Sequence, residues 1–310
     1  MGHEPHAYET LGPPTTSSSN GPRAHPGERG RLDDGFVFDY HALDDPDEDQ
    51  RFSNYWDVEP LCRGPRPTPD WLVTDRGAVD TDLGVLKTGK EADVFLLERA
   101  VPGTDRSVVL AAKRYRSSEH RTFHRSTTYT EGRRVRNSRD GRAMAKGSAH
   151  GRSVAAGQWA WAEWEGLKRC YEAGIPVPYP VQIDGTEILM ELVTDPELDG
   201  AAAPRLAQSR PDPVRLRSYF DQLRDAMATL AAMGVAHGDL SAYNTLAAGD
   251  RLVIIDLPQV VDIVANPAGT DFLMRDCHNV CSWFAARGLE VDEHQLFGEL
   301  VASAFGAQLG

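Results

Sequence analysis

The clearest hydrophobic pattern in the chain lies between residues 212 and 234. Large apolar side chains recur there at intervals of four and three residues, at Leu216, Phe220, Leu223, Met227 and Leu230. This spacing places all five on one face of an α-helix. Asp212 and Pro213 suit the start of such a helix, and Gly234 suits its end. We therefore predict an amphipathic helix with one buried stripe.

Residues 83–115 show a different pattern, which is typical of β-strands. Apolar side chains run through 92–97 and 108–114, and Pro102-Gly103 supplies a turn between the two runs. A further turn is expected at Thr88-Gly89-Lys90. We therefore predict strands joined by short turns in this part of the chain.

Beyond residue 150 the pattern predicts a helix, two hairpins and two helices besides the one already described. They are expected, in chain order, at 155–173, 181–192, 245–256, 271–287 and 292–305. Asp184-Gly185 and Gly249-Asp250 mark the two hairpin turns. Strands first and helices afterwards is typical of an α+β protein with two lobes.

The chain divides into a tail and two lobes. Gly, Pro, Ser and Thr dominate residues 1–30, and acidic residues interleave with aromatic ones over 31–60, so ordered structure is expected only from about Asp70. The expected parts are a disordered or loosely docked acidic tail over 1–68, an N-lobe over 69–194 with a basic flexible loop over 116–152, and a C-lobe over 195–310.

Composition narrows the class of protein. The chain has 310 residues, of which 41% are hydrophobic, which is enough for a sizeable core. No apolar run approaches the roughly 20 residues that a membrane helix needs, and the N-terminal residues lack the apolar stretch of a secretory signal. Four cysteines are too few for a disulfide scaffold. We therefore expect a cytoplasmic protein that does not contact a membrane.

Charge is distributed unevenly along the chain. The net charge of −13 argues against a general nucleic-acid coat. However, residues 31–60 hold ten acidic and two basic side chains, whereas residues 113–152 hold twelve basic and three acidic ones. The basic segment contains Arg133-Arg134-Val135-Arg136-Asn137-Ser138-Arg139, whose guanidinium groups suit RNA phosphates, an acidic partner or the phosphates of ATP. A solvated loop that only offsets an acidic body is the alternative.

The sequence HGDLSAYN at residues 237–244 carries the most specific chemical signal. It fits the phosphotransferase loop pattern H-x-D-L-x-x-x-N, with Gly238 where an arginine is usual. In this pattern the carboxylate of Asp239 accepts the proton of an attacking hydroxyl, and the amide oxygen of Asn244 coordinates a metal. Asp256 follows twelve residues later, after a predicted hairpin, where a second metal carboxylate is expected.

Residues that precede this loop in the chain are candidates for binding the phosphates of a nucleotide. Lys113 ends an apolar strand, like the lysine of the V-A-I-K pattern that contacts the α- and β-phosphates. Glu163 is the expected ion-pair partner of this lysine, and Glu165 is the rival on the same predicted helix. The turn over 86–94 would cover the phosphates, although it has one glycine where three are usual.

At these motifs the chain resembles the RIO-type atypical protein kinases. The similar segments are Thr88-Gly89-Lys90-Glu91-Ala92, the strand ending at Lys113, Trp159-Ala160-x-x-Glu163-Trp164, Ala173-Gly174-Ile175-Pro176-Val177-Pro178, the 237–244 loop, Ile255-Asp256-x-Pro258-Gln259 and Phe272-Leu273-x-Arg275-Asp276-Cys277-x-Asn279-Val280. The resemblance covers about residues 70–287 and favours Glu163 over Glu165. It implies a kinase-like fold with a strand-rich N-lobe and a short helical C-lobe lacking a long activation loop.

The resemblance implies ATP binding and phosphoryl transfer with Mg²⁺ or Mn²⁺. Asp239 would be the catalytic base, Asn244 and Asp256 would bind metal, and Lys113 with Glu163 would set the α- and β-phosphates. The implied ATP-binding residues are Thr88, Gly89, Lys90, Glu91, Ala92, Val94, Lys113, Met190, Glu191 and Val193, with Met190 as gatekeeper. In the family the carboxylate matching Asp256 can itself accept the phosphate. The family also implies serine/threonine kinase activity on a protein substrate and a link to ribosome assembly.

Departures from the usual kinase pattern qualify these expectations. Gly238 removes the arginine that answers a phosphorylated activation loop, and Pro258 replaces a usual glycine. Only about ten residues connect Gln259 to the next predicted helix. We therefore expect neither a phospho-switched activation loop nor a peptide-docking shelf, and we expect ATP turnover to exceed protein phosphorylation.

Two other functions remain open at the level of sequence. Small-molecule kinases of the aminoglycoside or choline type share H-G-D and a later metal-binding Asp, but they usually have a larger C-terminal lobe than the roughly 50 residues that follow Asp256 here. A nucleotide-sensing module with negligible turnover is the second alternative. It is disfavoured because Lys113, Asp239 and Asn244 are present together with Asp256.

Overall fold

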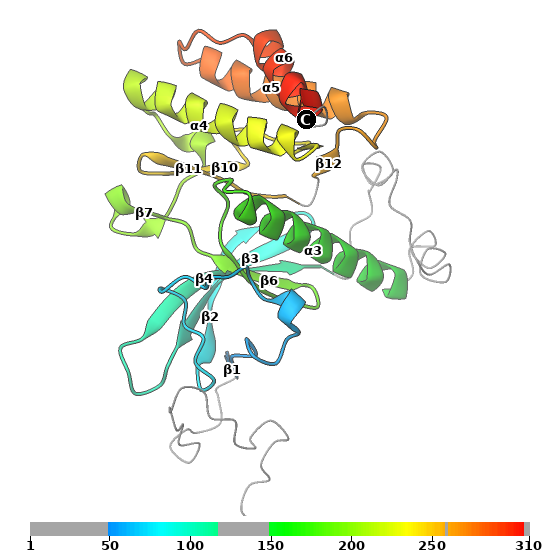
Figure 1. Cartoon of the computed structure of the whole chain (residues 1–310). Helices are drawn as coiled ribbons and strands as arrows, with labels where there is room; N and C mark the ends of the chain where they lie inside the picture. The colour runs from blue at the N-terminus through cyan, green and yellow to red at the C-terminus, as the bar shows by residue number, and fades with distance from the viewer. Residues whose placement is uncertain (1–48, 117–148, 258–259, 307–310) are drawn as a thin grey trace, which may run out of the picture. The chain divides into compact units, whose positions relative to one another are not determined.

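The computed structural model describes residues 49–116, 149–257 and 260–306 (Figure 1), with the side chains of the first long helix described from Ala155 onward. All of these residues belong to one compact unit of the chain. Residues 1–48, Pro258, Gln259 and most of the basic loop lie outside the described residues.

The N-lobe is built on an antiparallel sheet with the strand order β1-β2-β3-β4-β6-β5. Its strands are β1 (Gln50–Phe52), β2 (Val79–Thr88), β3 (Ala92–Ala100), β4 (Ser107–Tyr115), β5 (Pro180–Asp184) and β6 (Glu187–Glu191). Helix α3 (Ala149–Glu172) contacts β4, β5 and β6 (Figure 1). Its buried side chains include Ala156, Ala160, Trp164 and Leu167, spaced four, four and three residues apart. The helix begins at Ala149, before the predicted start at Ala155.

Ordered structure begins before Asp70, where the sequence pattern places its start. β1 pairs with β2 from Gln50↔Thr81 to Phe52↔Val79, and a 3₁₀ turn, η2 (Pro60–Cys62), follows. Tyr55 and Leu72 are buried against side chains of the sheet. Residues 49–68, expected within a disordered or loosely docked tail, therefore pair and pack with the N-lobe, where Tyr55 is buried.

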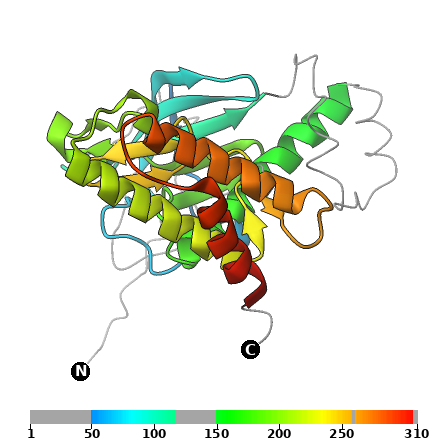
Figure 2. The same ribbon diagram turned by 90° about the horizontal axis from the view of Figure 1, so that it is seen from above.

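Residues 195–211 lie between the lobes and are rich in Pro, Ala and Gly, a composition typical of a linker, but they contain short regular pieces. β7 (Thr194–Asp195) pairs with β8 (Ala201–Ala202), and the 3₁₀ turns η3 (Pro196–Leu198) and η4 (Leu206–Gln208) follow each strand. The C-lobe elements are α4 (Pro213–Ala232), β9 (Val235–Ala236), β10 (Thr245–Ala248), β11 (Arg251–Ile254), β12 (Val261–Asp262), α5 (Gly269–Ala285) and α6 (Glu293–Gly306). Helix α6 packs against both α4 and α5 (Figure 2).

Helix α4 confirms the strongest prediction from the sequence. The Asp212 side chain accepts hydrogen bonds from the backbone N–H groups of Val214 (2.8 Å) and Arg215 (3.0 Å), which caps the helix. All five residues of the predicted apolar stripe are buried.

Across the part of the chain that the structure describes, no helix is both long enough and apolar enough to span a bilayer.

Candidate active site

The 237–244 loop connects β9 to β10 and is held in place by α5. The buried carboxylate of Asp276 accepts hydrogen bonds from the backbone N–H groups of Gly238 and Leu240, both at 2.8 Å. Asn279, one helical turn later, donates to the carbonyl oxygen of Leu240 at 3.2 Å. Burial raises the pKa of Asp276 to about 6, although His237 and the two N–H donors act in the opposite direction.

Gly238 adopts a backbone conformation that explains the missing arginine. Its φ is +86°, a left-handed region that a side chain makes costly. The guanidinium of Arg275, from α5, donates a hydrogen bond to the carbonyl oxygen of Gly238 and lies 3.9 Å from a carboxylate oxygen of Asp239. A guanidinium therefore stands beside Asp239, but a distant helix supplies it.

Asn244 is fixed by the loop in which it lies. Its side-chain nitrogen donates to the carbonyl oxygen of Asp239 at 2.9 Å, and its backbone N–H donates to Ser241 at 2.9 Å. The first bond determines which end of the amide faces the loop. The amide oxygen is left as the end that can serve as a metal ligand.

Asp256 is held near Asn244 by a backbone hydrogen bond of its neighbour, Ile255. The N–H of Ile255 donates to the carbonyl oxygen of Asn244 at 2.9 Å, and the His237 ring nitrogen lies 3.1 Å from the carbonyl oxygen of Ile255. Asp256 has a φ of +67°, which Asp and Asn tolerate better than most residues. Its side chain is 48% exposed. The loop, Asn244 and Asp256 therefore converge on one place.

Lys113 joins this place to the N-lobe. Its ammonium lies 2.7 Å from Glu163 and 2.9 Å from Asp256. Glu165 pairs instead with Lys168 at 2.8 Å, so the structure selects Glu163 from the two candidates. Burial alone would lower the pKa of Lys113, but the carboxylates of Glu163 and Asp256 hold it well above its usual range. Burial likewise opposes the ionisation of Asp256, yet Lys113 lowers the pKa of this carboxyl.

The predicted adenine-binding residues lie where β6 leads into β7. Met190 pairs with Ala111 across the β4–β6 ladder and is buried. The N–H of Glu191 donates to Tyr179 at 2.9 Å, and the carboxylate of Glu191 accepts from the N–H of Tyr179 at 3.0 Å. The carbonyl oxygen of Val193 accepts from Ala203 at 2.9 Å. These bonds fix the chain direction through the segment.

The predicted phosphate-covering turn joins β2 to β3. The N–H of Gly89 donates to the carbonyl oxygen of Ala92 at 3.0 Å, and a Cβ at position 89 would lie only 2.7 Å from that oxygen. Thr88, Lys90 and Glu91 complete the turn. Val94, at the start of β3, pairs directly with Lys113 in β4. The turn is therefore one strand away from the lysine.

The chain is similar to known proteins of one family. A family model described as the RIO domain matches residues 105–296. The RIO-type serine/threonine-protein kinase Rio1 of Haloferax volcanii is 34% identical over 226 residues, which cover 73% of this chain and 70% of the relative. The chain belongs to the RIO kinase family. The family resemblance drawn from the sequence motifs is thus confirmed, and a small-molecule kinase is set aside.

Other relatives of this RIO-family chain are more distant or longer. The serine/threonine-protein kinase RIO1 of Saccharomyces cerevisiae is 30% identical over 258 residues, and the match spans 49% of its length. Among solved structures, the Rio2 kinase–ADP/Mg²⁺–phosphoaspartate complex of Chaetomium thermophilum is 21% identical with a TM-score of 0.50, covering 74% of this chain and 67% of that one. This likeness confirms the two-lobed kinase fold.

Tyr115 contacts the Lys113–Glu163 pair, although the sequence motifs did not single it out. Its hydroxyl donates to the second carboxylate oxygen of Glu163, and its ring centre lies 5.3 Å from the Lys113 ammonium. Burial raises the pKa of Tyr115 well above its usual range, as does the charge of Glu163. The available signal was its position two residues after Lys113, which places both side chains on one face of β4.

Arg205 is a second residue that sequence analysis missed. It forms an isolated β-bridge with Leu246 in β10, and the N–H of Ala247 donates to the carbonyl oxygen of Pro204 at 2.9 Å. Burial lowers the pKa of Arg205, and its charge is one of the influences that lower the pKa of Asp256. No sequence signal marked it, because its surroundings resemble a linker.

The donor set fits a magnesium ion shared with a nucleotide. Among the described residues no group of three His, Cys, Asp or Glu side chains could bind a metal alone. Mg²⁺ in phosphotransferases is usually bound through one or two protein oxygens together with substrate phosphates. Asn244 and Asp256 supply such oxygens, next to a lysine that suits phosphate.

Proposed function

We propose that this chain binds ATP with Mg²⁺ and transfers the γ-phosphoryl group. The observation that carries the proposal is the position of Lys113, which contacts Glu163 on α3 and Asp256 beside the 237–244 loop. A largely buried lysine flanked by two carboxylates remains charged, as phosphate binding requires. The family to which the chain belongs supports the same activity.

Each residue of the site has a role in this proposal. Lys113 contacts the α- and β-phosphates, and Glu163 with Tyr115 orients it. Asn244 and Asp256 bind Mg²⁺, or Mn²⁺ in its place, which would neutralise phosphate charge. The backbone of Glu191 and Val193 bonds adenine beside Met190. The remaining proposed ATP contacts lie in and after the β2–β3 turn, at Thr88, Gly89, Lys90, Glu91, Ala92 and Val94.

Asp256 is also the proposed first acceptor of the phosphoryl group. One carboxylate oxygen forms a bond to the γ-phosphorus as the bond from that phosphorus to ADP breaks. Water then hydrolyses the aspartyl phosphate, which releases phosphate and restores the carboxylate. The lowered pKa of Asp256 favours the ionised nucleophile. A relative has been solved as a complex named for ADP, Mg²⁺ and phosphoaspartate.

Transfer to a protein serine or threonine is the second outcome that we propose for the same site. Asp239 would accept the hydroxyl proton. Residues 257–268 form a short connection from Asp256 to α5, and the described part of it contains β12. This length supports ATP turnover as the main activity, with protein phosphorylation slower.

The test is incubation with labelled ATP and Mg²⁺. We expect the wild type to release labelled phosphate and to accumulate an acid-labile protein phosphate. Asp256→Asn, which keeps the left-handed backbone accessible, should reduce both by about 100-fold or more. Asp239→Ala should reduce transfer to serine or threonine peptides while leaving the aspartyl phosphate. Neither label nor release in the wild type would leave only a nucleotide-binding module.

We further propose that the basic segment 113–152 contacts RNA or a ribosomal particle. Arg114 forms ion pairs with Asp82 and Glu187, and Arg116 pairs with Asp93, so neither charge is available to a partner. The proposal therefore rests on the nine basic residues that follow Arg116. RNA affinity should fall steeply as salt rises, and affinity independent of salt would contradict it.

The four cysteines support a cytoplasmic location, which we propose as well. All of them are free, and Cys170, Cys277 and Cys281 are buried. Unpaired thiols are typical of a reducing compartment. A tagged full-length chain should fractionate with the cytoplasm, and recovery outside it would contradict the proposal.

A further inference from the structure

Residues 49–72, which we call the N-terminal strap, cross the N-lobe and reach α3. The match to the RIO domain begins at residue 105, so the strap lies outside it. It contains β1 and η2 and buries Tyr55 and Leu72 against the sheet. The strap begins in the blue segment of Figure 1.

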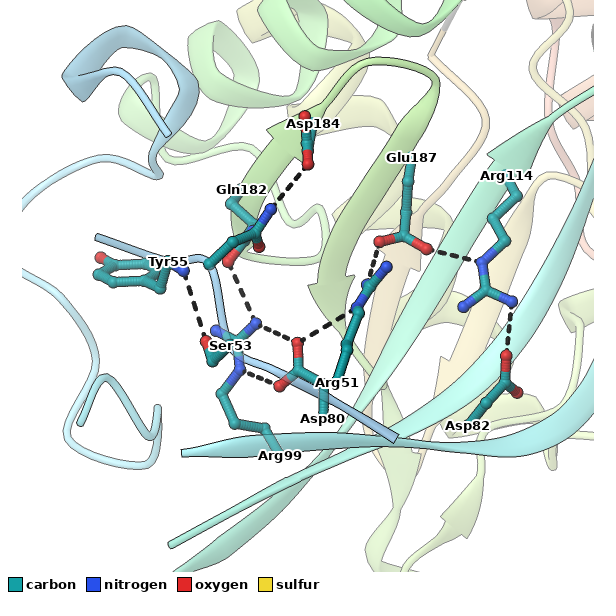
Figure 3. A network of polar contacts seen from close by, with 11 residues as sticks. Arg51, Ser53, Tyr55, Asp80, Asp82, Arg99, Arg114, Gln182, Asp184 and Glu187 are labelled. Carbon is teal, nitrogen blue, oxygen red and sulfur yellow. Dashed lines mark hydrogen bonds and ion pairs between the residues drawn. The ribbon is translucent and has the colours of Figure 1, made fainter. Parts of the chain in front are cut away.

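A polar network ties the start of the strap to the sheet (Figure 3). Arg51 pairs with Glu187, and Asn54 donates to Asp184 at 2.7 Å while accepting from Gln182 at 2.6 Å. Gln182 in turn accepts from Arg99 at 3.1 Å. Since Gln182 and Arg99 are buried, their polar groups require these partners.

The middle of the strap approaches β5 closely at Gly64. Its N–H donates to Val181 at 3.0 Å, and the Tyr179 hydroxyl donates to the carbonyl oxygen of Pro65 at 2.8 Å. A Cβ at position 64 would lie 2.0 Å from the carbonyl oxygen of Pro180 and 2.7 Å from the Tyr179 hydroxyl. Any side chain at this position must therefore displace the strap.

One carbonyl group of the strap bonds two side chains of α3. The oxygen of Leu61 accepts from the indole N–H of Trp164 and from the ammonium of Lys168, both at 3.1 Å. Trp164 is fully buried, so its N–H needs this partner. Trp164 directly follows Glu163 in the chain. The contact therefore lies beside the residue that binds Lys113.

We propose that the N-terminal strap is a positioning element for the Lys113–Glu163 ion pair. Lys113 and Tyr115 contact Glu163 of helix α3, and the Leu61 carbonyl contacts the next residue, Trp164. Displacing the strap lets the helix turn or shift, which lengthens the Lys113–Glu163 contact. The inference rests on the proposed ATP-dependent function and extends the site to residues before the matched domain.

The main variant is Gly64→Ala in the full chain, and Gly157→Ala is its matched control. Gly157 lies on α3, the helix that the strap contacts, and a Cβ there meets nothing within 4 Å. Gly64→Ala should raise the KM for ATP by about tenfold, since a small misplacement of a phosphate-binding group has effects of this order. Gly157→Ala should leave the KM within about twofold. Equal KM values for the two variants would overturn the proposal.

A double-mutant cycle separates positioning from general destabilisation. If the strap acts through Glu163, then Gly64→Ala should change the KM by less than about twofold in a Glu163→Gln background. The same full effect in both backgrounds would show that the strap does not act through this ion pair. Trp164→Phe removes the donor but keeps a ring, so it provides a milder variant if Gly64→Ala does not fold.

Amine labelling of Lys113 tests the proposal without ATP turnover. In the wild type the Lys113 side chain is 14% exposed and its ammonium contacts two carboxylates, so an amine-reactive ester should label it slowly. Labelling measured by mass spectrometry should be about threefold faster in Gly64→Ala or Trp164→Phe, and unchanged in Gly157→Ala. Unchanged labelling in folded strap variants would overturn the strap proposal alone, whereas absent turnover in the wild type would count against the proposed function alone.

Discussion

Gly238 and Asp276 show how single residues shape the catalytic loop. The left-handed conformation of Gly238 turns its N–H toward Asp276 and its carbonyl oxygen toward Arg275. Adjacent residues of α5 thus bond both polar groups of one residue. The loop departs from the usual kinase sequence because its shape requires glycine, and the guanidinium then comes from another element.

Restoring the usual arginine should therefore damage the protein. We expect Gly238→Arg to lower the free energy of unfolding by about 1–2 kcal/mol through backbone strain, and by more if Arg275 is displaced. Gly298→Arg is the control, since Gly298 lies on α6 with open space around it and arginine favours a helix. Urea denaturation measures both, and a stabilised Gly238→Arg protein would contradict the explanation.

The raised pKa of Asp276 leads us to expect that the stability of the protein depends on pH. Burial raises its pKa from 3.8 to about 6, so between these values the folded state holds a proton that the unfolded state has lost. The contribution of Asp276 to stability therefore falls by about 2 kcal/mol as pH rises from 4 to 7. The unfolding free energy of Asp276→Asn relative to wild type should rise by about that amount over this range. Parallel pH curves for the two proteins would exclude the raised pKa.

At the scale of elements, α4 illustrates what periodicity predicts well. A capped, amphipathic helix is defined by neighbours three and four residues apart, so the sequence contains all the information needed. The strap is the opposite case. Its aromatic residues alternate with charged ones, and the partner of Arg51 lies 136 residues away. Local sequence cannot reveal such a partner, which is why the strap resembled a tail.

Helix α4 gives a prediction about the core of the C-lobe. Leu223 is buried in the apolar stripe, whereas Val214 on the same helix is 82% exposed. Leu223→Ala should lower the free energy of unfolding by about 2–5 kcal/mol, because it leaves a cavity. Val214→Ala should change it by less than about 0.5 kcal/mol. Similar losses in urea denaturation would contradict the assigned burial.

The candidate site likewise contains residues that the sequence predicted and residues that only the tertiary structure revealed. Lys113, Asp239, Asn244 and Asp256 belong to motifs whose spacing reflects one reaction, and sequence predicted that they would converge. Choosing Glu163 over Glu165 needed the family resemblance, and the structure now supports the choice. Tyr115 and Arg205 contribute through tertiary contacts only. Arg205 lies in a segment whose composition suggested a linker, so its place beside β10 required the fold.

At the scale of the whole molecule, the Lys113–Asp256 contact joins residues 143 positions apart in the two lobes. A nucleotide that binds this site should stabilise the complete protein. At 100 times its Kd, Mg²⁺·ADP should add about 2.7 kcal/mol to the free energy of unfolding. For a chain of this size the expected rise in Tm is about 5 °C or more.

Thermal unfolding followed by circular dichroism measures this shift. Omitting Mg²⁺ or introducing Asp256→Asn should reduce the rise to about 1–2 °C, since both remove part of the phosphate-binding charge. Leu223→Ala should start from a lower Tm but retain the full rise, because it lies outside the site. A rise that does not depend on Mg²⁺ or on Asp256 would place nucleotide binding elsewhere.

The buried ion pair of Arg99 with Asp80 has a consequence for how such chains can diverge. The two side chains bond at 2.6 and 2.8 Å with no exposure to solvent. Replacing one partner leaves a buried charge without its counter-ion, which costs about 3–5 kcal/mol of stability. Replacing both partners with apolar residues can leave the stability unchanged. Positions 80 and 99 should therefore vary together across descendants of this sequence. If both residues were replaced by apolar ones, Gln182 would lose the donor Arg99, so Gln182 and its partner Asn54 would no longer need to be polar.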